Sequence, residues 1–248
     1  MKVLWYDPRM NKIFGYLFLR SWERNALNNF IVGRYTKAEE YFRKIQSVRP
    51  NKSGIGHYIG LVCLAQDRFE EAEQEFKREL DQFGDTFIRL KTLGDLYYMW
   101  GKRVECSKYY QHALELCDQV AERKLLEKRV EYTSDEKLFE KAMESYRAVK
   151  KGNAFMKEKN YESAYREFER AAKLDPYNFQ AWNNMGALEL NYKKNPSKAL
   201  TFFERAVEHT SLPAIHSNLK RAQMDLEKRN KELERERKKM EKKMKEMR

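Results

Sequence analysis

Apolar residues recur at three- and four-residue spacing along most of the chain, and this spacing predicts helices. Alternation of apolar and polar residues with a period of two, which would indicate strands, is scarce. The 248 residues include only 10 glycines and 5 prolines, which suits long helices joined by short turns. The sequence therefore predicts an all-α protein.

One segment shows how two such helices would pair. It combines small residues, phenylalanines and a terminal proline: Gly152, Phe155, Ala164, Phe168, Ala171 and Pro176. The small residues let two helices approach closely, the phenylalanines fill the space between them, and the proline ends the second helix. A helix pair that cannot bury its own apolar face must stack on further copies, so the segment predicts an elongated solenoid.

The same pattern continues in both directions with a period of about 34 residues. It predicts three units over 19–52, 53–86 and 87–120, and two more over 145–178 and 179–213. The last unit fits only after a one-residue insertion near Asn195, in the turn between its helices. Glu79 departs from the pattern, because it occupies a position that is small in the other units.

These residues and their spacing resemble the tetratricopeptide repeat family over residues 19–213. The resemblance implies antiparallel helix pairs stacked into a right-handed superhelix, with the first helix of each pair lining a concave face. It also implies a non-catalytic adaptor or assembly scaffold for protein–protein interactions in a larger complex.

Residues 121–144 fall outside the repeat pattern but keep apolar residues at helical spacing. We expect a helical insertion here, made of two long helices. Thr133 followed by Glu136 is a capping-box pattern, which predicts that a new helix begins there and continues into the fourth unit.

Residues 214–248 predict a capping helix that covers the last unit and continues as a long charged helix. Leu219, Leu226, Leu233 and Met240 lie seven residues apart, but taken as position a of a heptad they leave Ala222, Arg229, Glu236 and Lys243 at position d. Pairs such as Glu234 with Lys238 favour a solvated single helix. A dimerising coiled coil, and so a homo-oligomer, stays open.

The net charge of +12 favours acidic partners without naming one. Residues 221–248 contain twelve basic and seven acidic residues, so binding of nucleic acid or of an anionic membrane surface by this tail is the alternative function. Residues 1–18 form an aromatic and basic segment that would pack on the first repeat or lie near a membrane. The apolar run 13–19 is too short to span a bilayer, so we expect a cytoplasmic protein, at most peripheral to a membrane-associated complex.

The sequence contains no phosphate-binding glycine loop and no metal-ligand motif, and its four histidines are scattered. We therefore expect no catalytic, cofactor or metal site. Cys63 and Cys106 occupy positions that the repeat buries, and Cys106 lies too far along one helix from Cys117 to pair with it. Core packing in a reducing compartment is the role we expect for these cysteines.

The concave face is the candidate binding site. Positions that line it in the family combine basic, aromatic and amide side chains, which suit an acidic or amphipathic partner segment. The residues proposed for this groove are Arg24, Tyr58, Lys91, Tyr98, Tyr146, Lys150, Asn153, Lys157 and Asn184. The same positions include Asn183 and Asn191.

One subfamily holds the carboxylate of a chaperone's C-terminal tail with two asparagines and three cations. Asn153 and Asn184 match its asparagines, but Val149 occupies the first basic position. The other two basic positions fall on Ile215 and Leu219, or on Ala214 and Asn218 if the insertion is not counted. Without these cations a carboxylate would lose its charge-assisted hydrogen bonds, so we do not expect a chaperone clamp.

Overall fold

The computed structural model describes the backbone of residues 8–246, with side chains described from Phe18 onward. Over this range the chain forms twelve helices and no strand, which confirms the predicted all-α architecture. Consecutive helices pack against each other in pairs. The chain divides into two compact units, Met1–Leu116 and Cys117–Arg248, here called unit 1 and unit 2.

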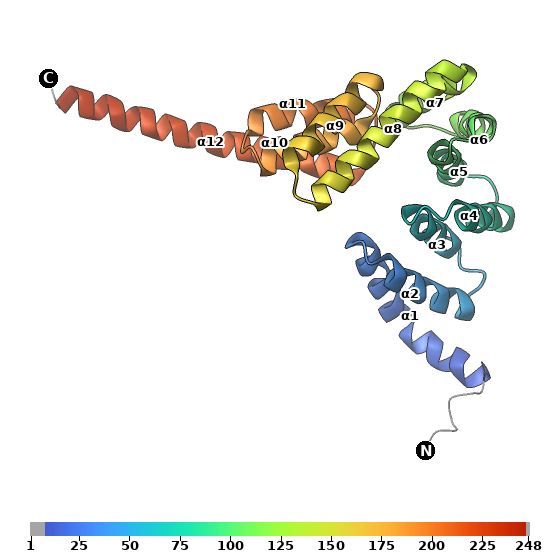
Figure 1. The fold of residues 1–248 in the computed structure, drawn as a ribbon. Coiled ribbons are helices and arrows are strands. Elements are labelled where there is room, and N and C mark those ends of the chain that lie inside the picture. Colours follow the sequence, from blue (N-terminus) through green and yellow to red (C-terminus); the bar gives the residue numbers. More distant parts are fainter. Residues whose placement is uncertain (1–7, 247–248) are drawn as a thin grey trace. The chain divides into compact units, whose positions relative to one another are not determined.

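Unit 1 consists of three helix pairs (Figure 1). They are α1 (Pro8–Ile31) with α2 (Tyr35–Val48), α3 (Ile55–Ala65) with α4 (Phe69–Phe83), and α5 (Phe87–Trp100) with α6 (Arg103–Glu115). The second helix of each pair also packs on the first helix of the next pair, so the apolar faces of the three pairs form a continuous stack.

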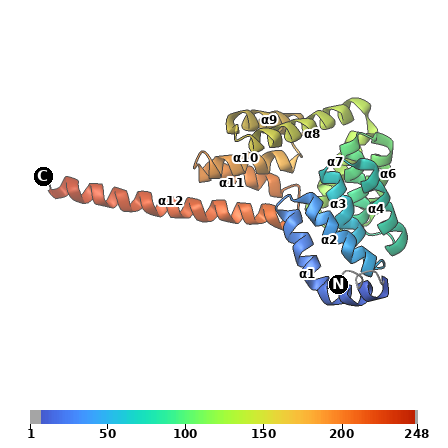
Figure 2. The same cartoon turned by 60° about the horizontal axis from the view of Figure 1, so that its bottom comes forward.

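Unit 2 begins with α7 (Val120–Ser134) and contains two helix pairs and a long last helix. The pairs are α8 (Glu136–Lys157) with α9 (Tyr161–Leu174) and α10 (Phe179–Asn191) with α11 (Pro196–Val207), followed by α12 (Pro213–Glu246). The first part of α12 packs on α11 and α10, and the rest of the helix extends beyond them (Figure 2).

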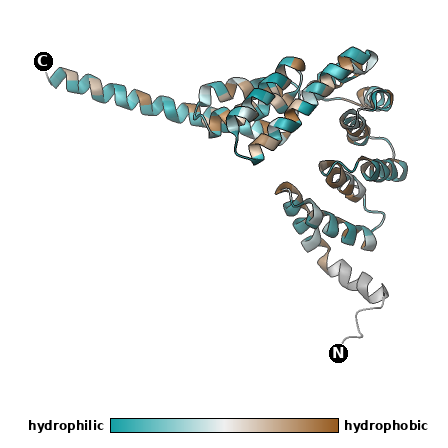
Figure 3. Ribbon diagram, viewed as in Figure 1, coloured by the Kyte–Doolittle hydropathy of each residue, from teal (hydrophilic) through white to brown (hydrophobic). Residues whose placement is uncertain are grey.

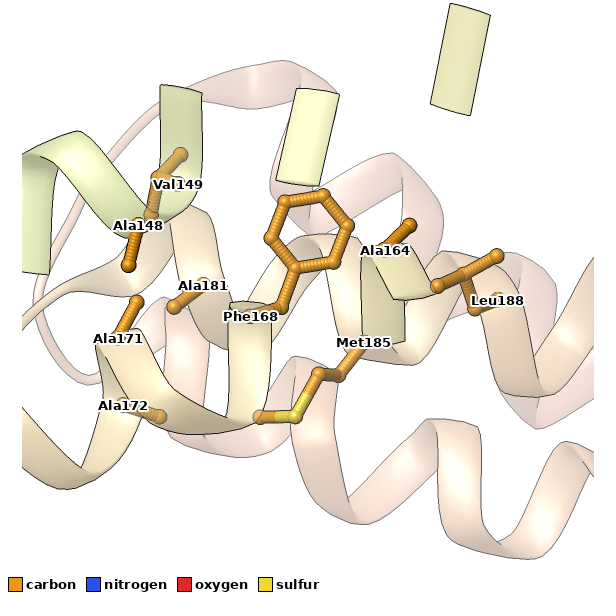
Figure 4. Packing of buried hydrophobic residues seen from close by; sticks show 9 residues of the cluster. All are labelled: Ala148, Val149, Ala164, Phe168, Ala171, Ala172, Ala181, Met185 and Leu188. Carbon is orange, nitrogen blue, oxygen red and sulfur yellow. The ribbon is translucent and has the colours of Figure 1, made fainter. Parts of the chain in front are cut away.

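The same contact recurs in four of the pairs, where a glycine of the first helix meets an aromatic ring of the second. The contacts are Gly60 with Phe76, Gly94 with Tyr110, Gly152 with Phe168, and Gly186 with Phe203. A Cβ atom on these glycines would lie 2.3, 2.4, 2.5 and 2.7 Å from the ring carbons. Any larger residue would therefore force the ring or the helix to move. Figure 4 shows Phe168 among the small side chains of its cluster.

The extra residue predicted near Asn195 lies in the turn between α10 and α11. That turn spans residues 192–195, whereas the turn between α8 and α9 spans 158–160. Both turns contain a residue with a left-handed backbone, Lys194 at φ 54° and Lys159 at φ 60°, so the extra residue leaves this feature of the turn unchanged. Insertion in the turn leaves the contact between Gly186 and Phe203 intact, so the pattern of small and aromatic residues continues through the last pair.

The first helix runs without a break across residue 18, where the sequence predicts the boundary between the N-terminal segment and the first repeat. Pro8 lies at its first position, where a missing N–H costs no helical hydrogen bond. Trp5 and Tyr6, the first aromatic residues of that segment, lie outside the described residues. The five repeat ranges themselves stay predictions.

The predicted capping box at Thr133 is wrong. Thr133 lies inside α7, and its hydroxyl donates a hydrogen bond to the carbonyl of Val130 at 2.8 Å. Asp135 caps α8 instead, because its carboxylate accepts a hydrogen bond from the Leu138 amide at 2.8 Å. A new helix does begin at Glu136 and continues to Lys157, as the sequence predicts.

Buried polar groups attach α7 to the rest of unit 2. Asp175, which is fully buried, accepts hydrogen bonds from Arg129 Nη1 at 3.3 Å, from the Tyr132 hydroxyl at 2.9 Å and from the Tyr177 amide at 3.0 Å. Glu122, near the start of the same helix, accepts a hydrogen bond from the Ser211 amide at 3.1 Å. Helix α7 therefore packs against two turns, one after α9 and one before α12.

Glu79 has a structural reason to replace a small residue. Its buried carboxylate accepts hydrogen bonds from the Gly54 amide at 2.5 Å and the Ser53 hydroxyl at 3.2 Å, at the start of α3. Gly56 provides the space, because a Cβ atom there would lie 3.0 Å from Glu79 Oε2. The carboxylate thus satisfies an amide of the helix N-terminus, where negative charge is favourable.

All three cysteines are buried and free, as the sequence predicts for Cys63 and Cys106. Among the described residues, no helix combines the length and the apolar character needed to cross a bilayer.

Candidate functional site

A row of asparagine side chains crosses helices α8, α10 and α12 of unit 2. Asn184 on α10 donates a hydrogen bond from Nδ2 to Asn153 Oδ1 on α8, at 3.1 Å. Asn183 donates to Asn184 Oδ1 at 3.4 Å, and Asn218 on α12 donates to Asn183 Oδ1 at 2.9 Å. We call Asn153, Asn184, Asn183 and Asn218 the asparagine row. It joins three helices that are separated in sequence by α9 and α11.

The row keeps unused hydrogen-bonding capacity at the surface. A carboxamide has two N–H donors and an oxygen with two acceptor sites. Asn184 uses one donor toward Asn153 and one acceptor site toward Asn183. Asn153 is exposed, and the other three side chains of the row are half-buried. Such a surface can donate to and accept from the backbone of an extended peptide.

A stripe on α8 meets this row at Asn153. Tyr146, Lys150, Asn153 and Lys157 lie three or four residues apart and therefore share one helix face. Lys150 and Lys157 are exposed, and Tyr146 is half-buried. With Asn184, five of the nine predicted groove residues lie in unit 2. Two of them, Asn153 and Asn184, are hydrogen-bonded to each other.

The charge near the row is positive. The carboxylate on α10 belongs to Glu189, which is buried and lies 3.0 Å from Lys198 and 3.6 Å from Lys193. On α12, Arg221 Nη2 donates to Asn191 Oδ1 at 2.5 Å, which adds a further cation to this side of the unit. Cations on α8 and α12 therefore lie beside the row.

The other four predicted residues lie in unit 1. Arg24 is exposed on α1. Tyr58 is half-buried and stacks on Phe42, with ring centroids 5.1 Å apart. Lys91 Nζ lies 2.9 Å from Asp95 Oδ2, so a carboxylate on its own helix already accompanies this cation.

Tyr98 is buried at 5% exposure and offers little area to a partner. The sequence assigns it to a concave repeat position, but its side chain is almost fully covered by the rest of the protein. Its predicted role as a contact residue is not supported by this placement.

Asn218 and Arg221 lie outside the concave positions identified from the sequence. The repeat pattern assigns concave positions only to helices that begin a pair, and α12 has no second helix after it. Asn183 and Asn191 are among the concave positions identified from the sequence, and the structure places both in contact with α12.

Val149 and Ile215, two positions where the chaperone clamp would need cations, are buried and apolar. They contribute to the packing of the helix pairs.

Three residues in unit 1 place possible metal ligands close together. Carboxylate oxygens of Glu39 and Glu71 and the Cys63 sulfur lie within 4.8 Å of one another. Arg68 pairs with both carboxylates, and Arg43 lies 2.8 Å from Glu39. Although burial opposes its ionisation, hydrogen bonds from these two arginines lower the pKa of Glu39.

The thiol in this cluster disfavours a metal. Burial raises the pKa of Cys63 to about 11, whereas a metal needs the thiolate. The arginines already balance the charge of the carboxylates. We therefore assign the cluster to packing and ion pairing.

The basic tail is not a surface of one charge. Along the exposed part of α12, Lys238 lies 2.6 Å from Glu234 and Arg237 lies 2.9 Å from Glu241. Carboxylates thus alternate with the cations, which weakens attraction to a phosphate backbone.

Residues 149–213 match the model of the family described as tetratricopeptide repeat. The match covers the C-terminal part of α8, from residue 149 onward, and all of α9, α10 and α11. No curated protein is similar enough to match the sequence.

Several solved structures are similar to the chain at low identity. YrrB, described as a TPR protein with an unusual peptide-binding site, is 18% identical over 79% of this chain and 88% of its own, with a TM-score of 0.40. The Cut9–Hcn1 hetero-tetramer of the APC/C is 15% identical over 85% of this chain and 46% of its own, at 0.45. The TPR2AB domain of yeast Sti1 with pHSP90 is 13% identical over 88% and 87%, at 0.42.

Proposed function

We propose that this chain, whose residues 149–213 are tetratricopeptide repeats as its sequence indicates, is a non-catalytic scaffold for protein–protein interactions. Its binding surface would be the asparagine row of unit 2 together with the α8 stripe. The partner would present an extended segment that contains acidic residues.

The asparagine row is the observation that carries this proposal. Its four carboxamides are held in register by hydrogen bonds across α8, α10 and α12, so their orientation is set before a partner binds. Pre-ordered polar groups lose less conformational entropy on binding than mobile ones. Carboxamides also match the donors and acceptors of a peptide backbone, whatever its side chains.

The cations beside the row define the chemistry of the partner. Lys150 and Lys157 on α8 and Arg221 on α12 would attract carboxylates, and Tyr146 would supply apolar contact area. Aromatic and basic side chains together are typical of surfaces that bind acidic or amphipathic segments.

The first test selects peptides from a random displayed library on the full chain. We expect the selected peptides to be enriched in aspartate and glutamate. For one such peptide, labelled with a fluorophore, Asn184→Ala should weaken binding about fivefold to tenfold, because one net hydrogen bond contributes about 1 kcal/mol. Lys150→Glu should weaken it by a similar factor at low salt, and the effect should shrink as salt rises.

Lys173→Glu provides the matched control. It makes the same charge change on α9, where Lys173 is exposed and pairs with Glu169 at 3.2 Å, and it should leave peptide affinity unchanged. If Asn184→Ala and Lys150→Glu keep their helical content and bind as tightly as the control, the row is not the binding surface and the proposal is wrong.

A further inference from the structure

Beyond Leu226, which is half-buried, α12 has an exposed apolar stripe. Ile215 and Ala222 are the buried residues of this helix, and both lie in its first part. Further along, Leu233 is 53% exposed, Met240 67% and Met244 59%. Figure 3 shows apolar positions recurring along this otherwise polar helix.

The stripe has the spacing of a coiled-coil seam. With the leucines at position a, position d contains mostly charged residues, which do not suit a seam. If Leu226, Leu233 and Met240 instead occupy position d, position a contains Asn230, Arg237 and Met244. Leucine at d with an asparagine at a is typical of parallel two-stranded coiled coils, and Arg237 is a second polar residue at position a here.

We propose that this stripe binds the same stripe of a second copy of the chain, in a parallel and in-register two-stranded coiled coil. The two Asn230 side chains would face each other and hydrogen-bond. Leu226, Leu233, Met240 and Met244 would form the apolar layers on either side. This proposal does not depend on the peptide-binding function of unit 2.

Both signs of charge lie along the seam in the parallel orientation. Glu236 at position g and Glu241 at position e flank Arg237 at position a, and Arg237 Nε already lies 2.9 Å from Glu241 Oε1 within one helix. In a parallel, in-register pair the two Arg237 side chains would meet at position a, and Glu236 would face Glu241 of the second copy. The two arginines would therefore lie among four carboxylates. Arg229 at g, whose Nη1 also donates to the Lys194 carbonyl oxygen of its own chain at 3.0 Å, would face Glu234 at e of the second copy.

The antiparallel orientation would bring like charges together. In that arrangement e positions face e positions, and here they contain Glu227, Glu234 and Glu241. Repulsion among these carboxylates opposes it. The glutamates at position e therefore oppose the antiparallel orientation more than the parallel one, in which position e faces position g.

The test measures the mass of the full chain by sedimentation equilibrium. As the protein concentration increases from about 1 to 500 µM, the average mass should rise from that of a monomer toward that of a dimer, because association follows mass action. Met240→Glu should keep the protein monomeric over this range. Met224→Glu should not, because Met224 is also exposed, at 60%, but lies on the opposite face of the helix. Equal helical content in the two variants would exclude unfolding as the cause.

The orientation is tested by oxidative cross-linking of Asn230→Cys with oxidised glutathione. A parallel, in-register pair brings the two substituted positions together, so a covalent dimer should form, while Lys231→Cys on the outer face should form far less. The native cysteines do not compete, because all three are buried. A wild-type chain that stays monomeric, equal behaviour of Met240→Glu and Met224→Glu, or a dimer without cross-linking through position 230 would overturn the proposal.

Discussion

Replacing Asp175 with alanine is expected to lower the free energy of unfolding of unit 2 by about 3–5 kcal/mol. The carboxylate is fully buried and accepts three hydrogen bonds, one of them from Arg129, which is itself only 9% exposed. Without Asp175, the guanidinium would remain buried without its carboxylate partner. Urea denaturation followed by circular dichroism measures the loss.

The double variant Arg129→Met with Asp175→Ala separates the ion pair from the packing around it. Removing both charges should cost clearly less than removing the carboxylate alone, because no uncompensated charge remains. If Asp175→Ala costs less than about 1 kcal/mol, or if the double variant is no more stable than the single one, α7 is not held by this pair.

Replacing Phe168 with alanine is expected to cost a similar amount, about 3–5 kcal/mol. The ring has no exposed area and fills the space that Gly152 leaves between α8 and α9. Its loss removes apolar contacts and leaves a cavity, which two rigid helices can close only in part. The same denaturation experiment measures it.

Phe202→Ala is the matched control for this prediction. Phe202 packs on neighbouring residues of unit 2 but is only half-buried, so its truncation should cost markedly less than that of Phe168. Equal losses for the two variants would mean that the contact between glycine and phenylalanine does not determine how the pair packs.

The helix pairs could be predicted from the sequence because their contacts are local and periodic. Gly152 and Phe168 recur at the same spacing as Gly94 and Tyr110, and each pair of residues lies within one helical hairpin. The residue inserted near Asn195 changed the spacing without breaking the pattern, because a turn can absorb it.

The contacts of α7 could not be predicted in this way. Arg129 pairs with Asp175, and Glu122 accepts from Ser211, across long separations in the sequence. Each of these polar contacts occurs once, so the residues that make them do not recur at a regular spacing in the sequence. The cap of α8 was misassigned for a related reason, because Thr133 and Asp135 are both good capping residues and only the end of α7 decides between them.

The candidate site was predictable in part. The repeat register placed Asn153 and Asn184 on one face, and the structure shows that they are hydrogen-bonded. It could not place Asn218 or Arg221, since α12 begins no pair. The repeat register also does not predict how deeply a side chain is buried. It therefore includes Tyr98 among the groove residues, although this side chain is buried.

Nuclear magnetic resonance of the asparagine side-chain amides tests the central claim most directly. Titration of the ¹⁵N-labelled chain with a selected acidic peptide should shift the Nδ2 signals of Asn153, Asn183, Asn184 and Asn218, with smaller changes for Asn160 and Asn195, which cap helices at the turns. If the peptide binds while the four row signals stay in place, unit 2 does not bind its partner through the asparagine row.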